Sequence, residues 1–163
     1  MTYPTFTNQQ GLLQKNVTLS NIITLFNSIS DSNSYIQTST FGDIFEIDLN
    51  ETDYALAHLS IENANFSTHE LTYNFSLYIM DLVSKDESNE DNVLDDTLQV
   101  IGDYISQFKH NTSFGDMEHD YRLSDDISCE PFTERFDNEV TGWAANISIT
   151  VSFNASACAG DIM

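Results

Sequence analysis

The sequence predicts an α+β fold, in which an antiparallel sheet of four to six strands carries two main helices packed on one face. Residues 92–108 repeat apolar side chains every three or four positions, which is the spacing of a helix face. Residues 71–83 and 143–153 alternate apolar and polar side chains, which is the period of a half-buried strand. Because the helical segment lies between strand-like segments, we expect it to pack on the sheet that they build.

The predicted helix over 92–108 has signals along its whole length. Asn92 is expected to cap its start, and Asp95 and Asp96 lie in the first turn, where the helix dipole favours negative charge. Lys109 and His110 close the other end, where positive charge is favoured. The expected apolar face consists of Leu94, Leu98, Ile101, Ile105 and Phe108, widened by Val93, Val100 and Tyr104.

A second helix is predicted over 18–29. Its apolar residues Leu19, Ile22, Ile23, Phe26 and Ile29 repeat at helical spacing. Thr18 is a suitable N-cap, and the polar run over 30–34 ends the segment.

The remaining segments are predicted to be strands. A short strand covers 41–47, and a second over 54–61 is apolar on both faces, as a central strand would be. The connection from there to the strand at 71–83 is short enough for an antiparallel hairpin. After the helix, 114–123 and 127–140 are extended. The last strand begins near Gly142, which indicates a tight approach or bulge, and its expected inward residues are Trp143, Ala145, Ile147, Ile149, Val151 and Phe153.

The chain of 163 residues is long enough for one domain with a core of its own. We expect that domain over 18–153. Residues 1–17 show no periodicity and are predicted to be an N-terminal arm, and residues 154–163 form a small, polar C-terminal tail.

The charge of the chain is strongly negative. There are 26 acidic and 5 basic residues, and the formal net charge is −21. The basic residues do not cluster, so the sequence lacks the footprint that attracts nucleic acid or an anionic membrane. Three explanations of the acidity remain open: solubility alone, life in high salt, or a surface that repels nucleic acid.

Other compositional features concern the compartment. The chain has no apolar run of roughly 20 residues and no signal-peptide pattern at its start, so we expect a cytoplasmic protein or one assembled there. Cys129 and Cys158 are expected to be free thiols, with a disulfide between them as the alternative. Seven Asn-x-Ser/Thr triplets are better explained by composition than by glycosylation.

The sequence contains no recognised catalytic or metal motif, and we predict no catalytic residue and no cofactor. His58, His69, His110 and His119 lack metal-ligand spacing, and His58 is expected to be a core or surface residue. A pairing of Cys129 with a histidine is possible in principle, but no spacing supports it. Asp86, Ser88 and Glu90 alternate as in a calcium loop, yet the glycine and terminal glutamate of such a loop are missing. Asp116, Glu118 and Asp120 could hold a metal as alternate oxygen ligands, but they are expected to be the solvent-exposed face of an edge strand.

Four segments together resemble structural proteins of tailed bacteriophages that infect Bacteroidetes, including the crAss-like phages. They are FGDIFEI (41–47), LDDTLQVIGDYI (94–105), PFTERFD (131–137) and TGWAANISI (141–149). The order of elements over 18–153 is similar to that of phage tail terminator, tail completion and neck proteins.

The resemblance implies a non-enzymatic virion subunit with a tail-terminator-like fold, which forms a ring at the head–tail joint or the tail end. The ring would be a hexamer or dodecamer, would contact other neck, portal or tail proteins, and would let DNA pass without binding it. It would have no membrane partner. The extended segment over 114–140 is expected to reach a neighbour, and the predicted interface residues are Phe114, Asp116, Glu118, Phe132, Glu134, Arg135 and Phe136.

Two alternatives to the ring protein remain. The first is a secreted or cell-surface β-rich binding domain, which the Asn-x-Ser/Thr triplets favour. The second is a metal-dependent enzyme that uses the acids over 116–126.

Overall fold

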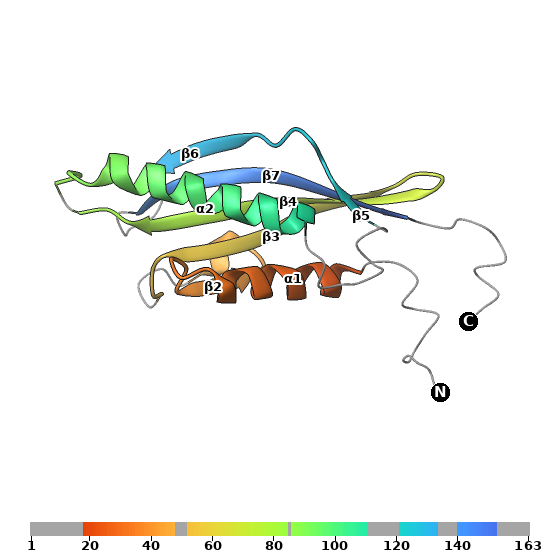
Figure 1. Cartoon of the computed structure of the whole chain (residues 1–163), viewed down its shortest axis with the longest axis horizontal. Coiled ribbons are helices and arrows are strands. Elements are labelled where there is room, and N and C mark those ends of the chain that lie inside the picture. Colours follow the sequence, from red (N-terminus) through yellow and green to blue (C-terminus); the bar gives the residue numbers. More distant parts are fainter. Residues whose placement is uncertain (1–17, 48–51, 85, 111–120, 134–139, 153–163) are drawn as a thin grey trace, which may run out of the picture.

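The computed structural model describes residues 18–47, 52–84, 86–110, 121–133 and 140–152. These residues form two α-helices and a six-stranded, mostly antiparallel sheet (Figure 1), which confirms the predicted α+β class. The elements are α1 (Leu19–Ser32), β2 (Thr38–Phe41), the 3-10 helix η2 (Ile44–Glu46), β3 (Leu56–Phe66), β4 (Glu70–Leu82), α2 (Glu90–His110), β5 (Tyr121–Leu123), β6 (Cys129–Thr133) and β7 (Val140–Ser152).

The sheet has the strand order β2-β3-β4-β7, and two short strands share the outer side of β7. β6 pairs with the first half of β7, from Thr141 to Ala145, and β5 pairs with its second half, from Ile149 to Val151. The β3–β4 hairpin, β4–β7, β5–β7 and β6–β7 pairs are antiparallel, but β2 runs parallel to β3. The sheet is therefore mostly antiparallel, as predicted, with one parallel pair at this edge that the sequence did not indicate.

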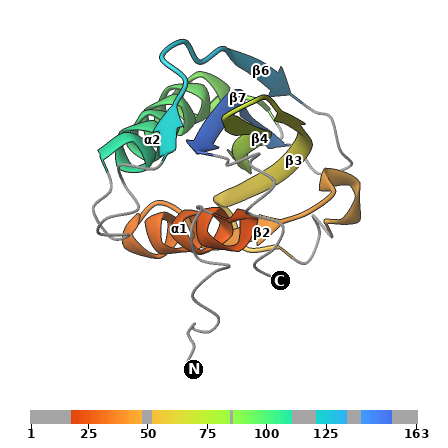
Figure 2. The ribbon, with the colours of Figure 1, turned by 90° about the vertical axis from the view of Figure 1, so that its right-hand side faces the viewer.

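The long strands β4 and β7 define two faces of the sheet, because successive side chains of a strand point to opposite sides. Phe75 is paired with Ile147 and Leu77 with Ala145, so these odd-numbered residues share one face. Both helices pack on this face (Figure 2), as predicted. Its main cluster contains Ile22, Leu25, Phe26 and Ile29 of α1, Val100, Ile101, Tyr104 and Phe108 of α2, and Ala57, Leu59, Phe75, Leu77, Ile79, Ala145, Ile147, Ile149 and Val151 of the sheet.

The two helices are also joined by a buried polar contact. The Tyr104 hydroxyl lies 2.6 Å from Ser30 Oγ, and Ser30 Oγ donates to the Phe26 carbonyl oxygen. Both side chains are buried, so each hydroxyl needs the partner that it finds here. Burial raises the pKa of Tyr104 to about 12, which keeps the phenol neutral.

The opposite face of the sheet, called the far face below, is covered by other described residues at one end. There Leu56, Met80, Phe132 and Val140 form a second buried cluster, with Ile44 of η2 packed against it. The rest of the far face carries polar side chains, which are described as the candidate surface below.

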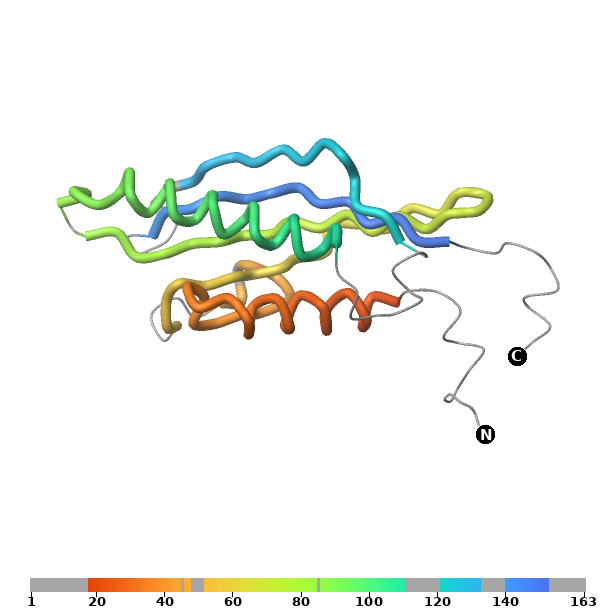
Figure 3. The backbone as a smooth tube through the Cα atoms, viewed as in Figure 1, coloured from red at the N-terminus to blue at the C-terminus, as the bar shows by residue number. Residues whose placement is uncertain are grey.

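The β3–β4 hairpin is longer than the helices that cover the sheet. Its turn lies beyond the ends of both helices (Figure 3). The strand predicted over 54–61 in fact runs over Leu56–Phe66, and residues 62–69 are all exposed. The Ser67 N–H donates to the Glu70 carbonyl oxygen, which closes the turn.

The prediction of a strand over 41–47 is wrong, because the strand in this region lies earlier in the chain. Only Phe41 belongs to a strand, β2, which begins at Thr38. Gly42 follows with φ of 135°, a conformation that L-side chains rarely adopt, and the chain then turns into η2. Ile44 and Ile47 pack at the end of the far face instead of extending the sheet.

The helix α2 begins earlier than predicted, so Asn92 lies inside it and is not its cap. The Val93 N–H donates to the Asn89 carbonyl oxygen, which sets the first turn at Glu90 and Asp91. The acidic first turn and the basic last turn at Lys109 and His110 are as expected for the helix dipole.

The buried face of α2 is rotated by about one residue from the predicted face. Leu98 is 41% exposed, whereas Thr97 is fully buried. Thr97 can be buried because its hydroxyl donates to the Val93 carbonyl oxygen within the helix. On the sheet side, the Trp143 indole N–H donates to the Leu94 carbonyl oxygen and fixes that rotation.

For the first helix, the prediction is confirmed. Thr18 and Asn21 form a capping box, in which each side chain accepts a hydrogen bond from the backbone N–H of the other. The helix continues past 29 to Ser32, and Ile23 is only half-buried.

Candidate interaction surface

The predicted interface residues fall almost entirely outside the described residues. Phe114, Asp116, Glu118, Glu134, Arg135 and Phe136 are in the ranges 111–120 and 134–139. Phe132 is described, and it packs in the second core cluster with 6% exposure. The arm over 1–17, the tail over 154–163 and Phe153 also lie outside the described residues.

The described residues hold no group of three or more His, Cys, Asp or Glu side chains arranged for a metal ion. The loop resembling a calcium site is organised by its own hydrogen bonds: Ser84 Oγ donates to Asp86 Oδ1 and to Asn89 Oδ1. The Ser88 N–H also donates to Asp86, and this bond lowers the pKa of the Asp86 carboxyl.

His58 is a core residue with both ring nitrogens hydrogen-bonded, and a core residue is one of the two positions that the sequence predicted for it. Its side chain is 1% exposed. Nε2 lies 2.8 Å from the Gly42 carbonyl oxygen, which can only accept, so Nε2 carries the proton. Nδ1 of the neutral ring then accepts from the Thr40 hydroxyl at 2.6 Å. Burial lowers the pKa of His58, so the neutral form is favoured.

Cys129 carries a free, half-buried thiol, and burial raises its pKa. Thiolate is the nucleophilic form of cysteine, so a raised pKa works against a catalytic role. Cys158, its possible disulfide partner, lies outside the described residues.

The part of the molecule with the most distinctive chemistry is the open portion of the far face. Nine exposed or half-buried side chains from three adjacent strands lie on it, and all are amides or hydroxyls. We call this set the neutral face: Ser60, Asn63, Asn65, Thr72, Asn74, Asn146, Ser148, Thr150 and Ser152.

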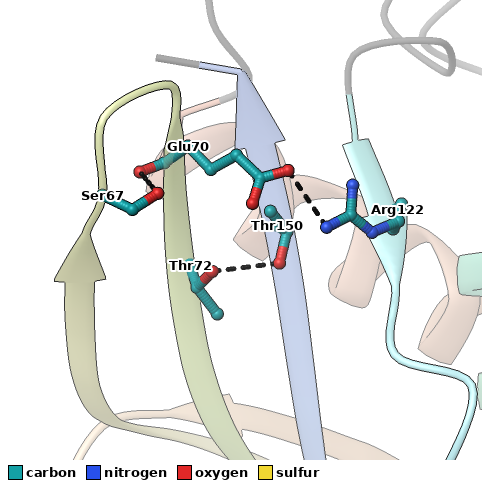
Figure 4. Close-up of polar contacts among 5 residues, drawn as sticks. All are labelled: Ser67, Glu70, Thr72, Arg122 and Thr150. Carbon is teal, nitrogen blue, oxygen red and sulfur yellow. Dashed lines mark hydrogen bonds and ion pairs between the residues drawn. The ribbon is translucent and has the colours of Figure 1, made fainter. Parts of the chain in front are cut away.

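Hydrogen bonds run across the strands of the neutral face. Asn74 lies at the centre: its amide N–H donates to Asn63 Oδ1 at 2.7 Å, and its oxygen accepts from Ser148 Oγ. One register step away, the Thr72 and Thr150 hydroxyls share a hydrogen bond of 3.0 Å (Figure 4). These cross-strand pairs hold the side chains in place and add to the stability of the sheet.

The rim of the neutral face carries a compensated pair of charges. Arg122 of β5 lies 3.0 Å from Glu70 at the start of β4 (Figure 4). Glu62, at the bulge of β3, is exposed. β7 itself has no charged residue along its whole length.

The outward side of α2 has the opposite character. Asp91, Asp95, Asp96 and Asp103 are exposed on it, on the other side of the sheet from the neutral face. The molecule therefore carries an acidic helix surface on one side of the sheet and, on the other side, a surface rich in amides and hydroxyls.

The alternation of the strands predicted that Thr72, Asn74, Asn146, Ser148 and Thr150 would face away from the core. It did not predict that they would form one surface, because that depends on the β4–β7 pairing and its register. One sequence signal for this surface was available: the last strand has no acidic residue, although the chain has 26 of them.

Neither described helix has the length and apolar character needed to cross a membrane. No protein-family model and no curated protein matches this chain.

Proposed function

We propose that the chain is a non-enzymatic structural subunit of a tailed-phage virion, which assembles into a ring at the head–tail joint or the tail end. The ring joins neighbouring neck, portal or tail proteins and lets DNA pass. The resemblance of four sequence segments to such proteins motivates the proposal.

The observation that carries the proposal is the separation of charge between the two sides of the subunit. A ring around DNA needs a surface that phosphate does not stick to, and exposed carboxylates repel phosphate. It also needs a surface on which neighbours can meet. The acidic side of α2, with Asp95, Asp96 and Asp103, suits the first task, and the neutral face suits the second.

The proposal is tested by the assembly state of the purified protein. We expect closed rings of six or twelve subunits in negative-stain images, with the same stoichiometry in native mass spectrometry. Because the subunits repel one another through their charge of −21, rings should be more abundant at high salt. A chain that stays monomeric at high concentration, at every salt concentration and with cognate neck or tail proteins present, contradicts the proposal.

One observation favours the second candidate, a secreted binding domain. Asn65 begins an Asn-x-Ser triplet and is exposed near the hairpin turn, where a glycan has room. The triplet at Asn74 is different, because the Asn74 side chain is already bonded to Asn63 and Ser148. Glycan mass on Asn65 of the native protein supports this candidate, and an unmodified Asn65 speaks against it.

A further inference from the structure

We propose that the neutral face is the surface on which a second copy of this chain is seated. The inference rests on the proposed ring and names the contact that holds it together. It is argued from charge, from hydrogen-bonding capacity and from exposure.

Charge determines where a second copy can approach. Each copy carries −21, so two copies repel each other wherever their carboxylates come close. The side of α2 with Asp95, Asp96 and Asp103 is therefore unfavourable for contact with a copy. On the far face, the charged residues at described strand positions are the paired Glu70 and Arg122 toward the hairpin end and the exposed Glu130 of β6, opposite Ala144. Glu62 is exposed at the bulge of β3. A partner as acidic as the chain itself is accommodated best on the neutral face.

The side chains of the neutral face also suit burial against another protein. Asn, Ser and Thr carry both donors and acceptors, so they can satisfy a polar partner surface without desolvating a charge. Their cross-strand bonds, such as Asn74 with Asn63, already fix several of them in place. Less side-chain entropy is then lost when the contact forms.

Exposure places the contact toward the hairpin end of the sheet. At the other end, Phe132 and its neighbours cover the far face. Toward the turn, Asn63, Asn65 and Ser152 are exposed, as is Asn146 in the middle of β7.

A basic partner is the main competitor for the occupant of this face, and the charge argument disfavours it. A basic protein would be attracted to the carboxylates of α2 rather than to amides and hydroxyls. The two occupants differ in salt dependence. Contact between acidic copies strengthens as salt screens their repulsion, whereas contact with a basic partner weakens.

The test places one negative charge on the neutral face and, as a matched control, the same charge on the acidic helix. Asn146→Asp changes an exposed side chain in the middle of the face with almost no change in shape. Gln99→Glu adds the same charge on the exposed side of α2. Assembly of wild type and both variants is measured by sedimentation velocity over a range of salt, and circular dichroism checks that each variant is folded.

We expect N146D to shift assembly to at least a tenfold higher protein concentration, roughly the effect of one uncompensated charge in an interface, and Q99E to assemble close to wild type. Wild-type assembly should strengthen with salt. Rings that form equally well in folded N146D overturn the inference and leave the ring proposal standing. Association of copies that weakens with salt also overturns it. Absence of rings in all three proteins, with cognate neck or tail proteins present, contradicts the ring proposal itself.

Discussion

Gly142 is a residue whose identity the sheet itself requires. A Cβ atom built on it would lie 1.9 Å from the Ile79 carbonyl oxygen and 2.9 Å from Met80 Cα, both of which are backbone atoms. Backbone in a central strand cannot move aside without breaking the β4–β7 ladder. The tight approach that the sequence indicated at this position is therefore confirmed.

We predict that Gly142→Ala lowers the free energy of unfolding by about 3 kcal/mol, at the upper end of the usual cost of overpacking. Urea denaturation followed by circular dichroism measures it. Gly102→Ala is the matched control, because nothing lies within 4 Å of its Cβ position on the exposed side of α2. Gly102→Ala should raise the free energy of unfolding by about 0.5–1 kcal/mol, because alanine has the higher helix propensity. Equal stability of G142A and wild type contradicts the close approach.

His58 predicts a pH dependence of stability. Burial lowers its pKa in the folded protein below the ordinary 6.5, against the opposing effects of the Gly42 carbonyl and Asp43. The unfolded chain therefore binds the proton more readily than the folded one. The stabilisation from the neutral ring is complete above pH 6.5 and is lost as the pH falls through the lowered folded value.

We expect the stability difference between wild type and His58→Gln to shrink as the pH falls below 6.5, because only wild type loses this contribution. Thermal unfolding at a series of pH values measures the difference. His69→Gln, at an exposed position of the hairpin turn, controls for removing an imidazole. Parallel pH curves of wild type and H58Q are the outcome that contradicts the prediction.

At the scale of elements, the capping box makes α1 begin at a defined residue. Thr18 Oγ1 accepts from the Asn21 N–H at 3.2 Å, and Asn21 Oδ1 accepts from the Thr18 N–H at 2.9 Å. These bonds satisfy backbone donors that the first turn leaves free. The cap matters here because β-branched residues in α1 give it only moderate intrinsic propensity.

Thr18→Ala should reduce the free energy of unfolding by about 1 kcal/mol, the usual value of an N-cap, while Thr18→Ser should change it by a few tenths. Thr24→Ala, at an exposed position in the middle of α1, is the control and should be neutral or slightly stabilising. The measurement is the midpoint of urea unfolding. A loss in T24A as large as that in T18A shows that the cap is not the cause.

The elements best predicted from the sequence are those with a strong period. The alternation in β4 and β7 and the capped pattern of α1 gave the correct type of element because one side of each is buried. The errors occurred where a tertiary contact decides. The pairing of β2 with β3 depends on which strand lies beside β2. The orientation of α2, which exposes Leu98, depends on the side chains that pack against the helix. No local pattern contains that information.

For the whole molecule, composition predicted the acidity, but only the fold shows how the charge is distributed. The exposed acids of α2 and the polar residues of the neutral face lie on opposite sides of the sheet. The packing of α2 against the helix-covered face separates them in space. Most predicted interface residues lie outside the described ranges, so their role stays a prediction.

The proposed acidic channel leads to a last prediction, which concerns assembled rings and DNA. Replacing Asp95, Asp96 and Asp103 by lysine reverses the charge of the α2 surface. If that surface lines the channel, the changed rings should retain linear duplex DNA that wild-type rings release, and retention should fall steeply with salt as released counterions return. Gel mobility shifts and a salt titration measure this.

The control carries the same change in net charge at other exposed acids, Glu46, Asp53 and Asp126. Because non-specific attraction depends on charge near the DNA rather than on total charge, this triple should bind duplex DNA much more weakly than the α2 triple. Equal retention by both triples means that net charge alone governs the effect, and the α2 surface is then not the channel lining. The same two sets of substitutions can be placed in the virion, where the rate of genome ejection is measured. If α2 lines the channel, only the α2 set should slow ejection.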